Sequence, residues 1–414
     1  MLETPRTWVR DLDLYYGWVV TGACFALVLA VFGISFSFSV FYDYLLADLG
    51  RSRSETSLVF SVQTMTLYVS SALIGGMVDR YSIRRATMVG TVLLGVGLAG
   101  ASQSGTLPEL LVSYGLVAGV GMGIVYVVGY TTVQRWFHRR RGVATAIATS
   151  GLGVATLVVP HVASYLIREL GWQTAYLFIM AGALAVLASA AVFLADDPVS
   201  FGVDPTQEFP EGYLAGSDRR TVREQVAEVL SVVRSRAFVS VFLNLVLTYT
   251  SLYVVLVHMV VYTKDVGLGR DVGVWTVSLS GAAAIPGRIA LGYVSDRLDR
   301  LTTYVALSVG MGVLVMSLSV ASTALSLYAF GLIYGFVYGG GAGLVPTLVA
   351  DLFGVDNISA FYGTAAVGLG VASVLGPFLA GTSYETLGTY TPVFLGSGAL
   401  AFVGAALAAT WRSG

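Results

Sequence analysis

Arg288 is the only charged residue between Asp271 and Asp296, so it lies inside a long apolar segment. A charge within hydrocarbon costs about 2.5–3.5 kcal/mol on membrane-insertion scales, and such a residue normally faces the protein interior and has a function. Its guanidinium stays protonated and presents a fork of donors that matches a carboxylate. The alternative is an arginine that extends to the nearby end of its own segment.

No carboxylate is placed to neutralise Arg288 permanently. The aspartates associated with the apolar segments all lie near segment ends, at Asp43, Asp48, Asp265, Asp271, Asp296 and Asp351. A buried cation without a fixed partner indicates a removable anion. We therefore predict that Arg288 binds a substrate carboxylate.

His258 lies about one helical turn from the end of another apolar segment. Histidine is the side chain whose charge changes near neutral pH, so His258 is a candidate proton-coupling residue. The alternative is a polar histidine at the membrane interface or at a gate.

Two pairs of tyrosines have helical spacing. Tyr126 and Tyr130 are four residues apart, as are Tyr334 and Tyr338, so each pair shares one face of a helix. Their hydroxyls could bind the second carboxylate oxygen of a substrate or a 2-hydroxy group. Tyrosines are also common at membrane interfaces, and the sequence alone leaves both readings open.

The composition is that of a membrane protein. Of 414 residues only 11% are charged and 56% are hydrophobic, whereas soluble domains carry about 25% charged residues. A net charge of −1 argues against nucleic-acid binding, and the single cysteine, Cys24, excludes an intrachain disulfide. The sequence shows no nucleophile–base pair, metal-ligand cluster or phosphate loop. We therefore predict neither an enzyme nor a cofactor.

A helix needs about 20 mainly apolar residues to cross a bilayer. Twelve such segments are separated by polar breaks, at residues 17–44, 57–78, 86–105, 109–133, 142–167, 173–194, 237–262, 271–295, 302–323, 327–350, 358–382 and 391–411. The sequence therefore predicts an all-α integral membrane protein with twelve transmembrane helices.

An internal repeat relates the first six segments to the last six. The segment Gly151–Pro160 matches Gly368–Pro377 at six of ten positions, with a separation of 217 residues. The same separation relates the Gly-x3-Asp-Arg motif at 75–80 to its copy at 292–297. Parallel repeats of this kind predict two pseudo-symmetric six-helix halves around a central cavity. The predicted parts are an N-terminal half at 1–194, a linker at 195–236 and a C-terminal half at 237–414.

The basic residues predict the orientation. The N-terminal segment, the even-numbered loops and the C-terminal segment hold 17 lysines and arginines, and the odd-numbered loops hold 5. Positive charge accumulates on the cytoplasmic side of a membrane protein. We therefore expect a protein of the cell (inner) membrane whose two termini and linker lie in the cytoplasm.

Several motifs resemble the major facilitator superfamily. The run Gly75-Gly-Met-Val-Asp-Arg-Tyr-Ser-Ile-Arg-Arg85 resembles its signature loop between spans 2 and 3. Tyr16-Gly-Trp18, the run from Arg135 to Gly142, and the run from Val257 to Arg297 are similar to the monocarboxylate-porter and oxalate/formate-antiporter branches. The resemblance covers nearly the whole chain and implies transport by alternating access.

The resemblance also implies roles for particular residues. Arg288 matches the arginine that binds the carboxylate in this branch. Family members place polar or aromatic contacts on spans 4 and 10, which favours Tyr126, Tyr334 and Tyr338 as substrate-binding residues. Further candidate substrate-binding residues are Phe36 and Asn244. Carboxylate–arginine pairs lie at the expected cytoplasmic helix ends and imply a conformational latch, formed by Asp79, Arg80, Asp296 and Arg297. The alternative is that these residues only anchor the helices at the membrane surface.

Residues that differ from those of the resembled family limit the number of negative charges expected on the substrate. Phe36 stands where the animal porters have a lysine, and Ala284 stands where they have an aspartate. Segment 358–382 has no basic residue, whereas oxalate carriers use a second cation there. One buried positive charge suits one carboxylate.

These observations predict a secondary transporter of small monocarboxylates such as lactate or pyruvate, working by proton-coupled symport as a monomer. The expected partners are the monocarboxylate anion, a proton and the lipid bilayer, with no nucleic acid. The alternatives are a carboxylate exchanger of the oxalate/formate type and a non-transporting carboxylate sensor.

Overall fold

The computed structural model describes residues 15–78, 82–137, 140–209, 230–353 and 358–412. Within these residues, twelve helical spans are long and apolar enough to cross a membrane, which confirms the predicted fold class. Eleven of the spans are single helices: α2 (Gly17–Leu49), α3 (Arg53–Val78), α4 (Ile83–Ser102), α7 (Arg141–Leu170), α8 (Trp172–Phe193), α11 (Arg236–Asp265), α12 (Arg270–Arg297), α13 (Arg300–Ser317), α14 (Ala324–Phe353), α15 (Ile358–Leu387) and α16 (Thr391–Ala409).

The fourth and tenth spans differ in regularity. The tenth is the single helix α14 (Ala324–Phe353), whereas the fourth joins α5 (Leu107–Leu110), the π-helix η1 (Leu111–Ala118) and α6 (Gly119–Trp136). The sequence did not predict the π-helical stretch. In the described residues, three short helices lie outside the spans: α9 (Pro198–Phe201), η2 (Pro205–Gln207) and η3 (Thr410–Arg412).

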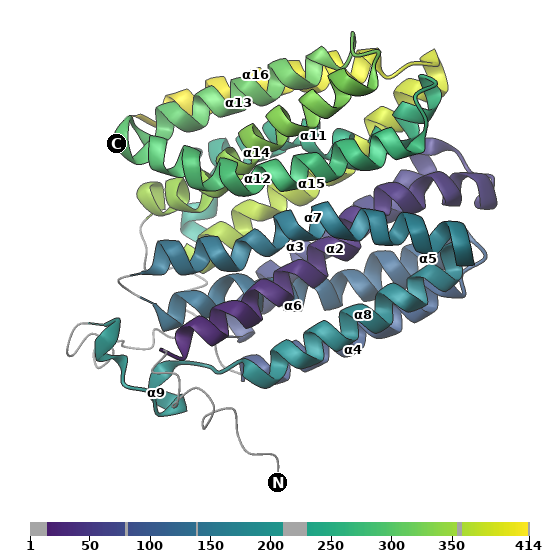
Figure 1. Ribbon diagram of the computed structural model, residues 1–414. Helices are drawn as coiled ribbons and strands as arrows, with labels where there is room; N and C mark the ends of the chain where they lie inside the picture. The colour runs from purple at the N-terminus through teal and green to yellow at the C-terminus, as the bar shows by residue number, and fades with distance from the viewer. Residues whose placement is uncertain (1–14, 79–81, 138–139, 210–229, 354–357, 413–414) are drawn as a thin grey trace.

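The spans pack as two bundles with matching neighbours (Figure 1). In the first bundle α2 packs on α7 and α8, and α4 packs on α6 and α8. In the second bundle the equivalent helices repeat these contacts, with α11 on α15 and α16, and α13 on α14 and α16. This packing agrees with the internal repeat in the sequence. The boundaries 1–194, 195–236 and 237–414 stay a prediction.

Three helix pairs join the bundles: α3 with α15, α7 with α12, and α2 with α11. Small residues bring α7 and α12 close together, because a Cβ atom on Gly281 would overlap Thr156 and one on Gly153 would overlap Ile285. Such close approach replaces the hydrophobic effect as a source of helix association in lipid.

Residues 195–209, the first part of the predicted linker, are packed against the first bundle. Trp136 donates its indole N–H to the Ala195 carbonyl at 3.0 Å, and the Tyr16 ring lies 4.4 Å from the Phe201 ring. The fully buried carboxylate of Glu208 pairs with Arg140 at 2.8 Å. Tyr16, Trp136 and Arg140 of the first bundle thus hold this segment in place.

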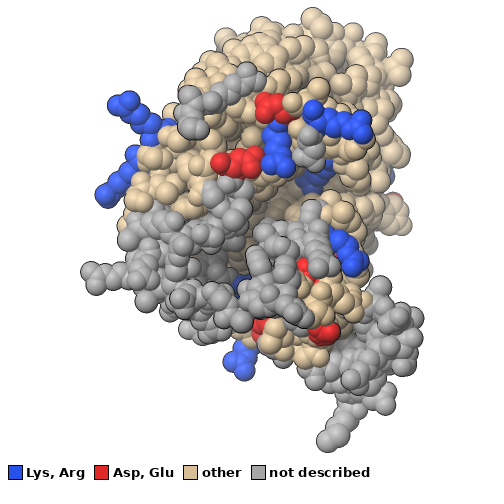
Figure 2. Space-filling model, turned by 90° about the vertical axis from the view of Figure 1, so that its left-hand side faces the viewer, with Lys and Arg blue, Asp and Glu red and all other residues tan. Residues whose placement is uncertain are grey.

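The two ends of the molecule differ. We call the end where α2 begins and α16 ends the near face, and the end with the α2–α3 and α11–α12 connections the far face. Figure 2 shows the near face, which is hollowed between the bundles. At the far face, charged and aromatic side chains join the bundles directly, as described below.

Candidate functional site

Arg288 lies on α12 at the junction of the two bundles. Its Nη1 donates to the Thr149 carbonyl of α7 at 2.9 Å, so the side chain reaches from the second bundle to the first. Its Nε is buried and has no hydrogen-bond partner in the described part of the chain. Among the described residues, no carboxylate oxygen lies within 4.0 Å of the guanidinium. The structure therefore holds a cation between the bundles without a paired anion.

Tight packing of α12 on α14 positions this side chain. A Cβ atom at Gly287 would overlap the Phe336 backbone, so the helices touch at the residue before Arg288. A Cβ atom at Gly343 would lie 3.5 Å from the Arg288 Cγ, so α14 passes directly beside the side-chain stem. The guanidinium extends to α7, where it meets the Thr149 carbonyl.

Four tyrosine hydroxyls interact electrostatically with Arg288 and come from four different helices. They belong to Tyr130 of α6, Tyr249 of α11, Tyr338 of α14 and Tyr362 of α15. The Tyr338 hydroxyl is buried and has no hydrogen-bond partner among the residues that the structure describes. Buried polar groups are normally paired, so an orphaned hydroxyl and an orphaned guanidinium N–H in one place fit the oxygens of an anionic ligand.

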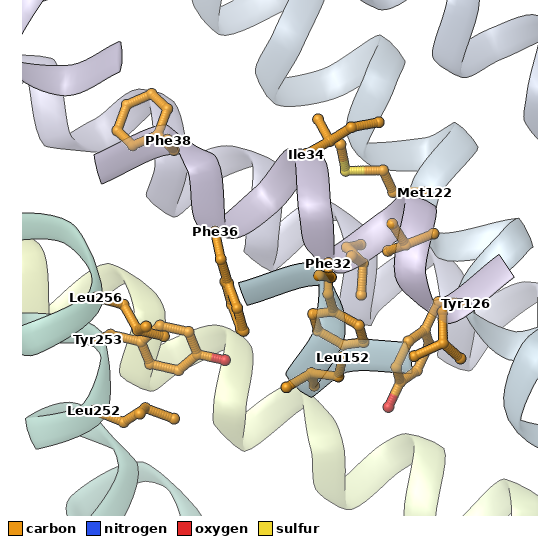
Figure 3. Close-up of a cluster of buried hydrophobic side chains, with 14 of the residues drawn as sticks. Phe32, Ile34, Phe36, Phe38, Met122, Tyr126, Leu152, Leu252, Tyr253 and Leu256 are labelled. Carbon is orange, nitrogen blue, oxygen red and sulfur yellow. The ribbon is translucent and has the colours of Figure 1, made fainter. Parts of the chain in front are cut away.

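An aromatic and aliphatic surface adjoins this polar group. Figure 3 shows Phe36 of α2 directed toward Tyr253 of α11, with Leu152 of α7 nearby. Tyr126 packs edge-on against Phe32 at 5.9 Å and lies 4.6 Å from the Tyr130 ring. Phe36 and Tyr126 therefore belong to a mainly apolar surface that continues to the tyrosines around Arg288.

Two tyrosine contacts cross between the bundles near this surface. The Tyr68 and Tyr253 hydroxyls are 3.2 Å apart, and Tyr126 interacts with Tyr362. Sequence reasoning missed Tyr249, Tyr253 and Tyr362. Tyr249 and Tyr253 are four residues apart, so the spacing that marked the other two pairs could have found them, whereas Tyr362 has no tyrosine at helical spacing.

Asn244 and Tyr334 do not reach Arg288. The fully buried Asn244 accepts from the Tyr304 hydroxyl at 2.6 Å and donates to the Gly404 carbonyl at 2.8 Å. Tyr334 stacks on Phe330 at 5.0 Å, and its hydroxyl lies 3.4 Å from Ser251. Both residues hold helices of the second bundle together.

His258 is buried near the far face, and the residues it contacts differ from those around Arg288. Its Nδ1 lies 3.2 Å from the Tyr390 hydroxyl and its Nε2 lies 2.9 Å from the Pro377 carbonyl. The Tyr42 ring of the first bundle packs edge-on against the imidazole at 5.0 Å.

Charged residues close the far face between the bundles. Arg53 of α3 binds both carboxylate oxygens of Asp265 of α11, at 2.6 and 3.0 Å. Asp43 of α2 is buried and pairs with Lys264 and Arg270 of the second bundle. The sequence marks these residues as charges at segment ends, but it does not show which of them meet.

Two further contacts complete this closure. Glu385 of α15 accepts from the backbone N–H and the hydroxyl of Ser54, at 2.6 and 3.0 Å. Arg168 of α7 lies 3.6 Å from Asp271 of α12, and both side chains are exposed. The far face is therefore closed by polar contacts while the near face is hollowed.

The predicted latch falls mostly outside the described part of the chain. Asp79, Arg80 and the side chain of Asp296 are not described. Arg297 is described, and its guanidinium lies 4.4 Å from the centre of the Tyr293 ring. The latch therefore stays a prediction.

Comparison with known proteins identifies the family. The model of the Major Facilitator Superfamily matches residues 23–356 and 242–414. The chain is 25% identical to monocarboxylate transporter 13 of Bos taurus over 402 residues, which cover 95% of this chain and 89% of the relative. It is 27% identical to monocarboxylate transporter 11 of Homo sapiens, over 94% of this chain and 81% of the relative.

A bacterial relative gives the same result. The chain is 25% identical to an uncharacterized MFS-type transporter of Escherichia coli, YhjX, over 83% of this chain and 82% of the relative. The matching family and the transporter relatives identify a multi-pass membrane transporter rather than an enzyme, as predicted. The chain belongs to the Major Facilitator Superfamily.

Proposed function

We propose that this transporter carries small monocarboxylates such as lactate or pyruvate, by proton-coupled symport. The observation that carries the proposal is the unpaired guanidinium of Arg288 at the junction of the bundles, beside the unpartnered hydroxyl of Tyr338. A carboxylate is the anion whose geometry matches the guanidinium fork. The relatives named as monocarboxylate transporters support the same substrate class.

The surroundings of Arg288 favour a small anion with one charge. In the proposed complex Arg288 binds the carboxylate and Tyr338 donates to one of its oxygens. Tyr126 and Phe36 contact the short apolar body, while Tyr334 and Asn244 act by holding the second bundle together. A dianion would lack a second cation, because α15 has no basic residue.

Binding of an anion neutralises the charge that Arg288 carries at the junction of the two bundles. The empty transporter must change conformation with Arg288 unpaired, and a bound carboxylate neutralises it. The hydrogen bond from Arg288 to Thr149 links the bundles at the same place, so ligand binding and bundle movement involve one side chain. This favours obligatory coupling to an anion and is compatible with exchange as the second candidate mechanism.

The remaining parts of the proposal concern the proton and the orientation. His258 is the proposed group that takes up the proton from the far-face side. The excess of arginine in the loops of the near face supports a cytoplasmic position for that face, in a plasma membrane protein that is proposed to work as a monomer. The proposed state is thus open to the cytoplasm and closed to the outside.

Uptake of labelled L-lactate into proteoliposomes tests the proposal, with and without an acidic exterior. Arg288→Ala and Arg288→Lys are compared with Arg300→Ala, a control at the exposed near-face end of α13. We expect gradient-driven uptake that is lost in Arg288→Ala, reduced in Arg288→Lys and kept in the control. Uptake that does not depend on the pH gradient and requires an anion inside the proteoliposomes would indicate exchange. No lactate uptake by folded protein would refute the substrate class.

A further inference from the structure

A chain of four groups links the two bundles at the far face. Arg53 of the first bundle donates from Nη1 to the Tyr390 hydroxyl at 2.6 Å. That hydroxyl lies 3.2 Å from the His258 Nδ1, and the His258 Nε2 lies 2.9 Å from the Pro377 carbonyl. His258, Pro377 and Tyr390 all belong to the second bundle.

The donors and acceptors of this chain fix the protonation of His258. A carbonyl only accepts, so the Nε2 of His258 carries a hydrogen that it donates to Pro377. A guanidinium only donates, so the Tyr390 oxygen accepts from Arg53 and its single hydrogen is directed to the His258 Nδ1. That nitrogen must then be unprotonated. In the closed far face, His258 is therefore neutral and in one tautomer.

A proton on Nδ1 conflicts with this arrangement. The new N–H would donate to the Tyr390 oxygen, which already accepts from Arg53, and two cations would share one neutral hydroxyl. The hydrogen of Tyr390 would also lose its acceptor in a buried place, which is unfavourable. Protonated His258 and the contact between Arg53 and Tyr390 therefore oppose each other.

The other groups that face His258 offer the imidazolium no compensation. Tyr42 of α2 presents its ring and donates its hydroxyl to the Arg53 carbonyl at 2.8 Å. The carboxylates nearest to this cluster are engaged elsewhere, since Asp265 binds Arg53 and Glu385 binds Ser54. Among the described residues, no carboxylate is hydrogen-bonded to His258.

Arg53 is also one of the residues that hold the far face closed. It pairs with Asp265 and lies 3.7 Å from the centre of the Tyr384 ring, both in the second bundle. Separation of α3 from the second bundle would remove Arg53 from Tyr390. The Tyr390 oxygen would then be free to accept a hydrogen bond from a protonated His258. The opened far face suits a charged histidine, and the closed one suits a neutral histidine.

We propose that Tyr390 is a positioning residue that makes closure of the far face conditional on a neutral His258. In the transporter without substrate, acid on that side holds the far face open, and a proton taken up by His258 must leave it before the far face closes. An empty transporter therefore does not carry a proton across on His258. This inference goes beyond the proposed function, because it concerns the transporter without any substrate.

Spin labels at two exposed far-face positions report the opening. Arg51→Cys lies in the connection before α3, and Ser322→Cys lies in the connection before α14. Cys24, the only natural cysteine, is fully buried and is replaced by alanine. The distance distribution between the labels is measured by double electron–electron resonance in lipid nanodiscs, between pH 8 and pH 5.5 and without substrate.

Wild type should shift from the short to the long distance as the pH falls. His258→Gln, which can make both hydrogen bonds without titrating, should keep the short distance over the whole range. Tyr390→Phe should lose at least half of the pH-dependent shift, because the hydroxyl that joins Arg53 to His258 is gone. The matched control is Tyr384→Phe, which keeps the ring beside Arg53 and should respond as wild type does.

Two results would overturn the proposal. One is a wild-type distance that does not change with pH. The other is a Tyr390→Phe response equal to that of Tyr384→Phe in protein that elutes as a single folded species. Neither result depends on lactate, so this test and the uptake test fail separately.

Discussion

The Asp43→Asn substitution should open the far face. Asp43 is 5% exposed and holds two cations of the second bundle, Lys264 and Arg270. Removing one partner of a fully buried ion pair costs about 3–5 kcal/mol, and exposed pairs contribute about 0.2–1 kcal/mol. The Lys264 side chain is 56% exposed and that of Arg270 is 24% exposed, so the cost belongs between these limits. We expect about 1–2 kcal/mol.

This energy acts on the conformational equilibrium rather than on folding. Asp43 contacts its cations only across the junction, and each bundle keeps its own helix packing. Since about 1.4 kcal/mol is a factor of ten, the ratio of open to closed far face should rise roughly 5- to 30-fold. The labels at residues 51 and 322 measure that ratio directly at pH 8.

A matched control separates this effect from a general loss of charge. Asp271→Asn removes another contact between the bundles, but Arg168 and Asp271 are 52% and 74% exposed and 3.6 Å apart. The control should change the ratio by less than about fivefold. An Asp43→Asn protein with an unchanged ratio, or with a more closed far face, would refute the reasoning.

Three further substitutions test other parts of the structure. Gly281→Val should abolish transport in protein that still reaches the membrane, because the side chain overlaps Thr156 where the bundles meet; quantitative blotting and uptake check this. Glu208→Gln should lower the stability of the first bundle by about 1–2 kcal/mol, since it weakens the pair between this buried carboxylate and the half-exposed Arg140, and a thermal melt measures it. Tyr338→Phe should raise the KM for lactate roughly tenfold with little change in the maximal rate, because one hydrogen bond to the carboxylate is lost.

The spans and Arg288 were predictable from the sequence for simple physical reasons. A run of about 20 apolar residues has few uses other than crossing a bilayer. A single charge inside such a run is expensive, so it singles out Arg288 without any knowledge of the neighbouring helices. The internal repeat then indicated which spans would occupy equivalent places.

The contacts between bundles were not predictable in the same way. Arg53 and Asp265 are 212 residues apart in the chain, and opposite charges at segment ends have many alternative partners. A buried amide such as Asn244 can serve helix packing as well as a ligand, so polarity alone does not identify its role. The position of Tyr362 beside Arg288 depends on how α15 is rotated, and its sequence does not fix that rotation.

Binding of L-lactate to purified transporter tests the central claim most directly, because it separates the site from the movement. Isothermal titration calorimetry in detergent compares wild type with Arg288→Ala and Arg288→Lys. We predict saturable binding to wild type, weaker binding to Arg288→Lys and no detectable binding to folded Arg288→Ala. Binding of lactate to Arg288→Ala with wild-type affinity would contradict the assignment of the substrate carboxylate to Arg288.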